Sequence, residues 1–295
     1  MNTQEEILDA YEYLLSDEKI SFELDGAINV STKNNYNIET ISLIHSFIDH
    51  TSLNGNDNEE SILKFIKKLK KSLQLHSINN VAAVCVFPKY IDLCKQELKD
   101  YAINIACVAG GFPYVQTYPE VRELECKLAN DSLCDEIDIV IPLGEAFSED
   151  LSIIRNDLKH IRKVCKDKTL KVILETGELK SAEQVFALSI IAMEEGADFI
   201  KTSTGKASMN ATMEAVFSMS YAIKQFYKKT GKKVGIKVSG GVSSTTKAIQ
   251  FYSVVKHILG EDWLNKDYFR IGTSSLTENI QKEYKTLKNQ PITEE

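Results

Sequence analysis

The sequence lacks the motifs that identify several classes of metal-binding and nucleotide-binding protein. Its six cysteines include no Cys-x-x-Cys pair, and its five histidines form no His-Glu-x-x-His or other closely spaced ligand pair. The segment STGKAS lacks the earlier glycine of a P-loop, and no Gly-x-Gly-x-x-Gly follows a predicted strand. These absences disfavour a zinc knuckle, a disulfide framework and a nucleotide cradle, and the scattered cysteines indicate reduced, intracellular thiols.

Positive charge and long apolar runs are scarce as well. The 35 lysines and arginines are outnumbered by 42 acidic residues, which gives a formal charge of -7 and a pI near 5.4. This balance disfavours nucleic-acid binding. The N-terminus is acidic and amphipathic, unlike a secretory signal. The longest largely apolar run, 185–193, is far shorter than the roughly 17 residues that span a bilayer. We therefore expect a cytoplasmic protein with no nucleic-acid or membrane partner.

The chain is long enough and apolar enough for one large folded unit. Hydrophobic residues make up 43% of its 295 residues, and α/β barrels of roughly 250 residues commonly form one domain. The first 40 residues stand apart, because a short helical pattern at 5–15 is followed by an asparagine-rich stretch at 31–37. We predict an N-terminal arm at 1–40 that is partly helical, a barrel at 41–285 and a polar C-terminal tail at 286–295.

Short β-branched segments alternate along the barrel region with amphipathic segments of helical length, such as 59–73, 150–165 and 182–196. The alternation is typical of β-α-β units with a parallel sheet. Eight strands are predicted, at residues 46–50, 81–87, 103–109, 136–141, 170–176, 198–203, 234–239 and 268–273. Eight repeats favour a closed (β/α)8 TIM barrel over a doubly wound sheet of about five or six strands.

Glycines and prolines gather at one end of the predicted strands. Pro88, Pro113 and Pro142 each follow a strand, where a missing N–H no longer interrupts the sheet. Eight of the 14 glycines lie at or just beyond strand carboxyl ends, namely Gly110, Gly111, Gly144, Gly177, Gly205, Gly240, Gly241 and Gly272. A turn alone accounts for any one of them, but the asymmetry between the two strand ends indicates the face on which barrel active sites are assembled.

Two lysines fall inside predicted strands, and each follows an isoleucine that would point to the opposite face. Lys201 lies in DFIKTSTGK and Lys237 in VGIKVSGG, so both are expected inside the barrel. Burial and a neighbouring positive charge lower the pKa of a lysine and make it nucleophilic near neutral pH, as imine formation requires. One such lysine is more often a snorkelling residue at a strand end, whereas two on neighbouring strands favour Schiff-base chemistry.

Acidic residues also occur within the strand patterns. Asp138 shares strand parity with Val140, and Asp49 lies in FIDHTSL. An inward carboxylate near lysines can balance charge or relay protons, and we interpret Asp138 as functional. Asp135 and Glu136 are interpreted instead as a solvated or salt-bridged entry to their strand.

Two glycine-containing loops have the composition of a phosphate site. SGGVSS at 239–244 and GTSS at 272–275 follow the seventh and eighth strands, which is the usual phosphate side of such barrels. No side chain obstructs the backbone N–H groups at these glycines, so the groups can converge on an anion. Gly205 and Lys206 follow the sixth strand and add a cation to this side.

Seven segments of the chain resemble deoxyribose-phosphate aldolases. They run in order from about residue 47 to residue 276 and read IDHTSL, AAVCVFP, DEIDIVIP, KVILETGEL, DFIKTSTGK, KVSGGV and IGTSSL. The resemblance implies a barrel that cleaves 2-deoxy-D-ribose 5-phosphate into D-glyceraldehyde 3-phosphate and acetaldehyde, in deoxyribose phosphate catabolism. It further implies a lysine Schiff base, a sugar-phosphate substrate and neither a metal nor an organic cofactor, and it allows a homodimer.

The same resemblance assigns roles by motif position. Lys201 resembles the Schiff-base lysine, Lys237 the partner that lowers its pKa, and Asp138 the acid/base residue that acts with an ordered water. The residues implied in substrate binding are Asp49, Thr51, Cys85, Thr204, Gly205, Lys206, Gly240, Gly241, Gly272, Ser274 and Ser275.

The chain departs from the family pattern at three places. Ser243 stands where many members have arginine, which removes one positive charge near the phosphate, and Lys206 is expected to compensate. The loop GGFPYVQTY differs from the usual glycine-ended loop after the third strand, and the tail QPITEE has no terminal tyrosine. Two other interpretations stay open: another lysine aldolase, such as a transaldolase or ketose-bisphosphate aldolase, and a catalytically idle barrel that binds sugar phosphates.

Overall fold

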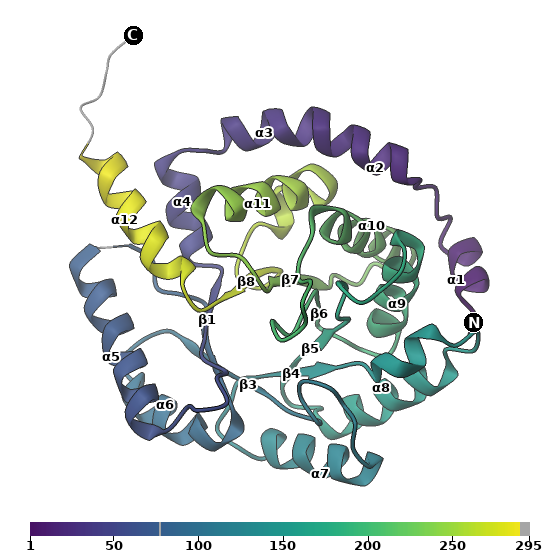
Figure 1. Cartoon of the computed structure of the whole chain (residues 1–295), viewed down its shortest axis with the longest axis horizontal. Helices are drawn as coiled ribbons and strands as arrows, with labels where there is room; N and C mark the ends of the chain where they lie inside the picture. The colour runs from purple at the N-terminus through teal and green to yellow at the C-terminus, as the bar shows by residue number, and fades with distance from the viewer. Residues whose placement is uncertain (77, 290–295) are drawn as a thin grey trace.

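Eight parallel strands close into a barrel (Figure 1). The computed structural model describes residues 1–76 and 78–289. Within them the strands pair in chain order and the last pairs with the first. Their bounds are β1 (Ile48–Thr51), β2 (Ala83–Val86), β3 (Asn104–Val108), β4 (Glu136–Val140), β5 (Thr169–Ile173), β6 (Phe199–Lys201), β7 (Gly235–Ser239) and β8 (Phe269–Thr273). Each lies within a predicted strand or extends one residue beyond it, and the predicted (β/α)8 fold is confirmed.

A ring of helices surrounds the barrel (Figure 1). Its members are α5 (Glu59–His76), α6 (Ile91–Glu97), α7 (Pro119–Asn130), α8 (Ser152–Val164), α9 (Ala182–Glu194), α10 (Met213–Thr230), α11 (Thr245–Leu259) and α12 (Leu276–Lys288). Three of them begin after a hydroxyl cap, at Ser181, Thr212 and Ser244, which accepts the N–H three residues later. Such a cap stabilises a helix start by about 1 kcal/mol. No helix in the described ranges is long and apolar enough to cross a membrane.

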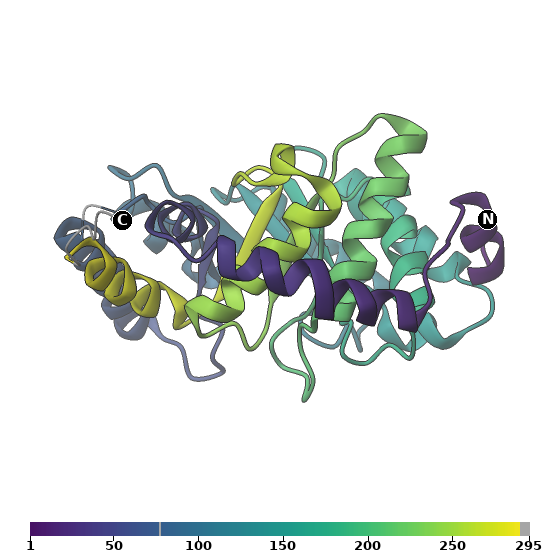
Figure 2. The ribbon, with the colours of Figure 1, turned by 90° about the horizontal axis from the view of Figure 1, so that it is seen from above.

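The first 45 residues form a further helical layer, seen along the side of the barrel in Figure 2. It consists of α1 (Gln4–Ala10), α2 (Asp17–Glu23), the π-helix η1 (Leu24–Ile28), α3 (Asn29–Asn34) and α4 (Ile38–His45). Ile7 and Ile20 are buried, and Asn35 Nδ2 donates to Ser253 Oγ of α11 at 3.0 Å. Much of the asparagine-rich stretch is therefore helical and packs on the barrel. The borders of the arm and of the tail stay predictions, because α12 runs to Lys288 and residues 290–295 lie outside the described part.

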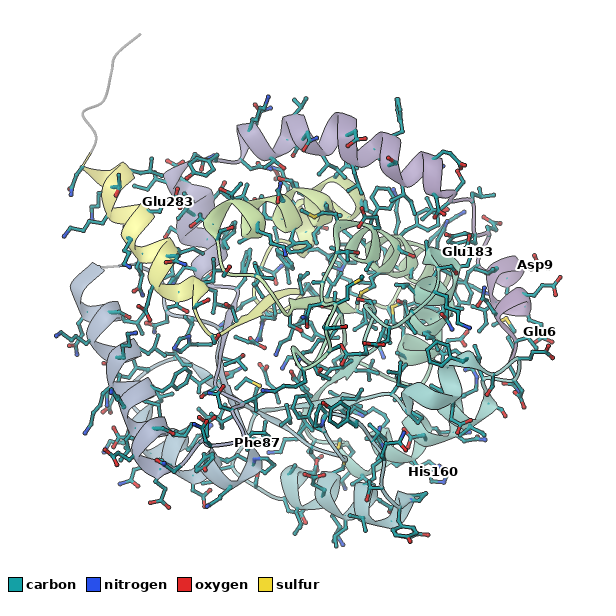
Figure 3. All side chains as sticks on the ribbon, in the orientation of Figure 1. Glu6, Asp9, Phe87, His160, Glu183 and Glu283 are labelled. Atoms are coloured by element: carbon teal, nitrogen blue, oxygen red, sulfur yellow. The ribbon has the colours of Figure 1, made fainter. Side chains whose placement is uncertain are left out.

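The strands present apolar side chains to the surrounding helices, and six of the eight strands also carry charged side chains that meet in the barrel interior. In β4, Ile137 and Ile139 join the main hydrophobic core, and Glu136 and Asp138 alternate with them. Side chains fill the interior of the barrel as well as the space between the strands and the helices (Figure 3). The interior of such barrels is usually filled by branched apolar residues, so a charged interior requires another explanation.

Candidate active site

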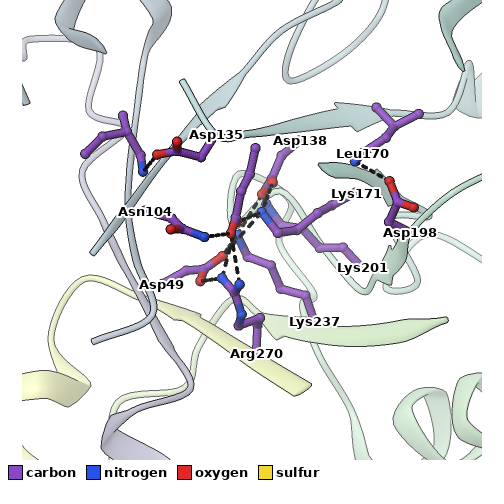
Figure 4. Close-up of polar contacts among 12 residues, drawn as sticks. Asp49, Asn104, Asp135, Asp138, Leu170, Lys171, Asp198, Lys201, Lys237 and Arg270 are labelled. Carbon is purple, nitrogen blue, oxygen red and sulfur yellow. Dashed lines mark hydrogen bonds and ion pairs between the residues drawn. The ribbon is translucent and has the colours of Figure 1, made fainter. Parts of the chain in front are cut away.

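Seven charged side chains meet inside the barrel, and we call them the charged network (Figure 4). They come from six of the strands and each is at most 3% exposed. The members are Asp49, Glu136, Asp138, Lys171, Lys201, Lys237 and Arg270. Buried charges are stable only when they are paired and hydrogen-bonded, so the arrangement of this network decides which protonation states it allows.

Asp138 lies at the centre of the network and binds three lysines. Its Oδ2 accepts a hydrogen bond from Lys201 Nζ and another from Lys237 Nζ, both at 2.7 Å. Its Oδ1 accepts from Lys171 Nζ at 2.9 Å. The structure therefore brings together the three residues that the sequence identified as catalytic candidates, and it adds a third lysine to them.

Asp49 and Glu136 pair with the other cations of the network, and neither forms an ion pair with Lys201. Asp49 pairs with Lys237 Nζ at 2.5 Å and with Arg270 Nη1 at 2.7 Å. Glu136 pairs with Arg270 Nη2 at 2.9 Å and with Lys171. Glu136 is thus salt-bridged, as one of the two interpretations of the strand entry required, but it is buried and not solvated. Its neighbour Asp135 pairs with Lys95 at 2.9 Å, where both side chains are partly exposed.

The network has one cation more than it has carboxylates. It contains three lysines and one arginine against two aspartates and one glutamate. An uncompensated charge is costly in a buried site. One neutral lysine gives three cations and three carboxylates, so the composition of the network favours a single deprotonated amine.

Lys201 is the lysine whose pKa falls below its usual range. Burial is the main cause, and the Lys237 ammonium lowers this pKa further, whereas Asp138 opposes the shift. Burial also disfavours the charged form of Lys237, but Asp138 and Asp49 outweigh it and raise the pKa of Lys237. Lys171 behaves like Lys237, because Asp138 and Glu136 raise its pKa despite burial. Lys201 is therefore the amine most readily deprotonated in the network.

A cavity of about 270 Å³ opens above Lys201 and Lys237 at the carboxyl end of the strands. Eleven of the predicted site residues line it: Thr51, Lys201, Thr204, Gly205, Lys206, Lys237, Gly240, Gly241, Gly272, Ser274 and Ser275. The residues that line it without having been predicted to bind substrate are Leu53, Asn54, Ser239, Val242, Ser243 and Thr273. The predicted phosphate loops and the two lysines thus share one hollow.

Three predicted residues do not line this cavity. Asp49 and Asp138 are fully buried beneath it, within the charged network. Cys85 is fully buried in a small apolar cluster that includes Leu53 and Val108, and burial raises the pKa of its thiol to about 11. The motif-based expectation of substrate contact at Asp49 and Cys85 therefore stays a prediction, because neither reaches the surface of the cavity in this structure.

The local geometry explains why glycine occupies three positions at the cavity. Gly240 and Gly241 have φ values of +87° and +73°, in the left-handed region that side chains disfavour. A Cβ on Gly272 would lie 2.9 Å from Ser239 Cβ and 3.1 Å from Lys237 Cε. Small residues here keep the cavity open and leave backbone N–H groups accessible to an anion.

Lys206 reaches the opposite wall of the cavity. Its Nζ donates to the carbonyl of Leu53 at 2.5 Å, and Ser243 adds no charge to the same lining. Lys206 and Ser243 therefore line the same cavity, and the expected compensation for the serine at 243 stays a prediction.

Lys171 and Arg270 were missed by the sequence analysis. Lys171 stands in TLKVIL and Arg270 in YFRIGT, each a charged residue between apolar strand residues. The same signal selected Lys201 and Lys237, and it could have found Arg270 as well, because Gly272 lies two residues after it. Across residues 1–76 and 78–289, no group of three or more His, Cys, Asp or Glu side chains is placed to hold a metal ion.

The fold and the site together define a barrel enzyme with a lysine-based centre at the carboxyl end of its strands. Residues 43–261 match the sequence profile of the DeoC/LacD family aldolases. The chain belongs to this family of lyases, which confirms the resemblance seen in the sequence.

Individual relatives are similar over most of the chain. The deoxyribose-phosphate aldolase of Homo sapiens is 39% identical over 249 residues, which cover 81% of this chain and 78% of the relative. That of Mus musculus is 37% identical over the same shares. Among solved structures, an aldolase named QR15 has a TM-score of 0.68 at 28% identity and covers 84% of this chain and 99% of its own. A tetrameric deoxyribose phosphate aldolase from Aeropyrum pernix shares the fold, with a TM-score of 0.68 at 22% identity, covering 88% and 98%.

Proposed function

We propose that this chain is a deoxyribose-phosphate aldolase that cleaves 2-deoxy-D-ribose 5-phosphate into D-glyceraldehyde 3-phosphate and acetaldehyde through a Schiff base on Lys201. The observation that carries the proposal is the position of Lys201, which is the lysine of lowered pKa and lines a cavity whose other wall is formed by glycine loops. The relatives named for this activity support the choice of substrate.

The geometry divides the reaction between the two halves of the cavity. The phosphate binds at the loops of Gly240, Gly241 and Gly272 and near Lys206, which leaves the C1 aldehyde of the open-chain sugar toward Lys201. Neutral Lys201 adds to C1 to give a carbinolamine, and transfer of a proton to its hydroxyl group followed by loss of water gives a protonated imine. Holding the reacting carbonyl against the amine converts a bimolecular step into an internal one.

The protonated imine then acts as the electron sink. A base removes the proton of the C3 hydroxyl, the C2–C3 bond breaks, and its electron pair forms the enamine as C3 becomes the aldehyde of glyceraldehyde 3-phosphate. Protonation of the enamine at C2 and hydrolysis release acetaldehyde and restore Lys201. We assign the proton transfers to Asp138 acting through an ordered water, because Asp138 Oδ2 lies 2.7 Å from Lys201 Nζ. The covalent intermediate divides one difficult step into two easier ones.

Two other functions predict different behaviour. A transaldolase or ketose-bisphosphate aldolase would act on a ketose, and an idle sugar-phosphate sensor would bind the substrate without turnover. The family match and the relatives favour an aldolase, and the lysine of lowered pKa at the cavity disfavours an idle barrel.

Release of acetaldehyde from deoxyribose 5-phosphate tests the proposed function directly. We expect turnover that excess EDTA leaves unchanged, because the protonated imine supplies the electron sink that a metal would otherwise provide. A ketose bisphosphate as substrate is the matched control and should give no cleavage. Activity that disappears with chelator and returns with zinc would contradict the Schiff-base assignment.

We also propose that the protein acts in the cytoplasm in catabolism of deoxyribose phosphate and forms a homodimer. All six cysteines are free and buried, which suits a reducing compartment. Large exposed hydrophobic side chains gather on α7 and at its start, where Tyr118, Val121, Leu124 and Leu128 are each more than half exposed. In Figure 1, α7 lies at the edge of the molecule opposite α2 and α3, with no element outside it.

The charges of α7 suit an antiparallel pair of helices. Leu124 lies near the middle of α7, with Glu120 and Glu123 before it and Lys127 after it. All three charged residues are exposed. A two-fold axis at Leu124 places Lys127 of one copy beside the glutamates of the other, whereas a parallel pair sets like charges together. Such a self-complementary patch is what a symmetric dimer requires.

A further inference from the structure

The backbone is strained at the end of β5, next to the cavity. Glu175 has a φ of +54°, a left-handed conformation that is rare for a residue other than glycine. It is 5% exposed. A strained residue of this kind is unfavourable and persists where its surroundings fix it, often at a functional site.

The strain coincides with an extra residue just past the end of β5, where the chain still hydrogen-bonds to the β6 segment. The N–H of Leu174 donates to Lys201 O, and the N–H of Thr176 donates to Thr202 O. The two donors are two residues apart, whereas their two acceptors are adjacent in the chain. Glu175, which lies between the donors, is therefore an extra residue on the β5 side. Irregularities of this type redirect a side chain, and they are common beside active sites.

The redirected carboxylate binds the segment that follows the reactive lysine. Glu175 Oε1 accepts the backbone N–H of Thr204 at 3.1 Å, and Oε2 accepts the Thr204 hydroxyl at 2.5 Å. The same hydroxyl oxygen accepts the backbone N–H of Lys206 at 3.0 Å. A chain of hydrogen bonds thus runs from Glu175 through Thr204 to Lys206, and hydrogen bonds to an ionised carboxylate are the strong ones.

The segment held in this way forms part of the cavity wall. Thr204, Gly205 and Lys206 all line the cavity, and Gly205 has a φ of +78°. Lys206 then extends to the carbonyl of Leu53 on the other side. Glu175 itself does not line the cavity, so any effect that it has on substrate must pass through Thr204 and Lys206.

We propose that Glu175 is a positioning residue, whose carboxylate orients Thr204 and Lys206 for the phosphate end of the substrate. The inference rests on the proposed function, because it assumes that the cavity binds a sugar phosphate. It assigns to the first glutamate of the ETGEL segment, Glu175, a role in substrate specificity, in place of a role in the bond-breaking step.

The test measures kcat and KM for deoxyribose 5-phosphate and for unphosphorylated deoxyribose. Glu175→Gln keeps the shape but loses one acceptor oxygen, so it should raise KM for the phosphorylated substrate about tenfold, the effect of one charge-assisted hydrogen bond. Turnover of deoxyribose should be nearly unchanged. Thr204→Val removes the hydroxyl that links Glu175 to Lys206, and it should give the same pattern even if the glutamine variant folds poorly. Glu178→Gln, at an exposed neighbour, is the matched control and should have no effect.

A double mutant separates positioning from simple stabilisation. If Glu175 acts through Lys206, Glu175→Gln should add little to the KM of a Lys206→Met variant. Equal losses on both substrates, or fully additive effects with Lys206→Met, would overturn the proposal. Wild-type protein that cleaves neither substrate would instead refute the proposed function, so the two failures are distinguishable.

Discussion

At the scale of single residues, the proposed chemistry depends on the difference between two lysines that share one carboxylate. Lys201 and Lys237 are paired across β6 and β7, and both bind Asp138 Oδ2. Only Lys237 has a second carboxylate, Asp49. That additional partner keeps Lys237 protonated, and the ammonium of Lys237 lowers the pKa of Lys201. Asp49 thus contributes to the opposite pKa shifts of the two lysines, on which the proposed division of roles rests.

The pH dependence of Lys237→Leu tests this division. Because Lys237 lowers the pKa of Lys201, its removal raises that pKa and leaves less neutral amine at neutral pH. The rise in activity with pH should therefore move to higher pH, each unit corresponding to about 1.4 kcal/mol. Turnover at neutral pH should fall sharply and partly recover in alkaline buffer.

The exposed Lys228→Leu, with a side chain 69% exposed, is the control for this measurement and should keep the wild-type profile. A profile for Lys237→Leu that is merely lower at every pH, with no displacement, would show that Lys237 does not set the pKa of Lys201.

At the scale of elements, the site depends on the loops that follow the strands. The loop after β7 carries Gly240 and Gly241 in left-handed conformations and then enters α11, whose first turn is capped by Ser244. A Cβ on Gly240 would collide with the side chain of Asn210, which belongs to the loop after β6. The two loops are therefore packed on one another, and the wall proposed to bind the phosphate is shared between elements.

Gly241→Val tests whether this wall binds the phosphate. Gly241 has a φ of +73°, so valine forces the backbone out of its present conformation. We expect KM for deoxyribose 5-phosphate to rise about tenfold or more, with little change for unphosphorylated deoxyribose.

Gly231→Ala provides the matched control, because Gly231 has a φ of +70° at the end of α10, away from the cavity. It should lower stability and leave KM unchanged. If Gly241→Val impairs both substrates equally, the loop supports the fold and not the phosphate.

At the scale of the whole molecule, the apolar face of α7 lies away from the N-terminal layer that covers other barrel helices. Leu124→Lys tests whether this face joins two copies. A lysine at the centre of the pair would bury two like charges, so the mass in solution should fall from that of a dimer to that of a monomer. Light scattering after size exclusion at fixed concentration measures this. Leu14→Lys, at a residue that is 70% exposed on the N-terminal arm, should leave the mass unchanged, and a monomeric wild type would refute the interface.

The sequence predicted the barrel well because each strand carries its own signal. Lys201 and Lys237 were identified since each interrupts an apolar strand just before a glycine turn. The packing of the charged network could not be predicted, because it depends on the register between strands. Glu136 follows a partly exposed aspartate in sequence, yet its side chain meets Arg270, which is 134 residues away.

The N-terminal layer shows the same limit over a longer range. Its few apolar residues, such as Ile7 and Ile20, give no local indication of the surface that they cover. Tyr11 Oη donates to Glu194 Oε1 at 2.7 Å, a contact between residues that are 183 apart in the chain. Contacts of this kind are fixed by the assembled barrel, and a reading of short segments cannot supply them.

Trapping of the covalent intermediate is the most direct test of the central claim, that Lys201 forms the imine. Borohydride added with deoxyribose 5-phosphate should reduce the imine to a stable secondary amine, and peptide mass spectrometry should find the added mass on Lys201. Lys201→Leu should show no adduct and no turnover while it still binds the sugar phosphate, and Lys237→Leu should still form some adduct at high pH. A label on Lys237 in the wild-type protein, or on neither lysine during active turnover, would contradict the account.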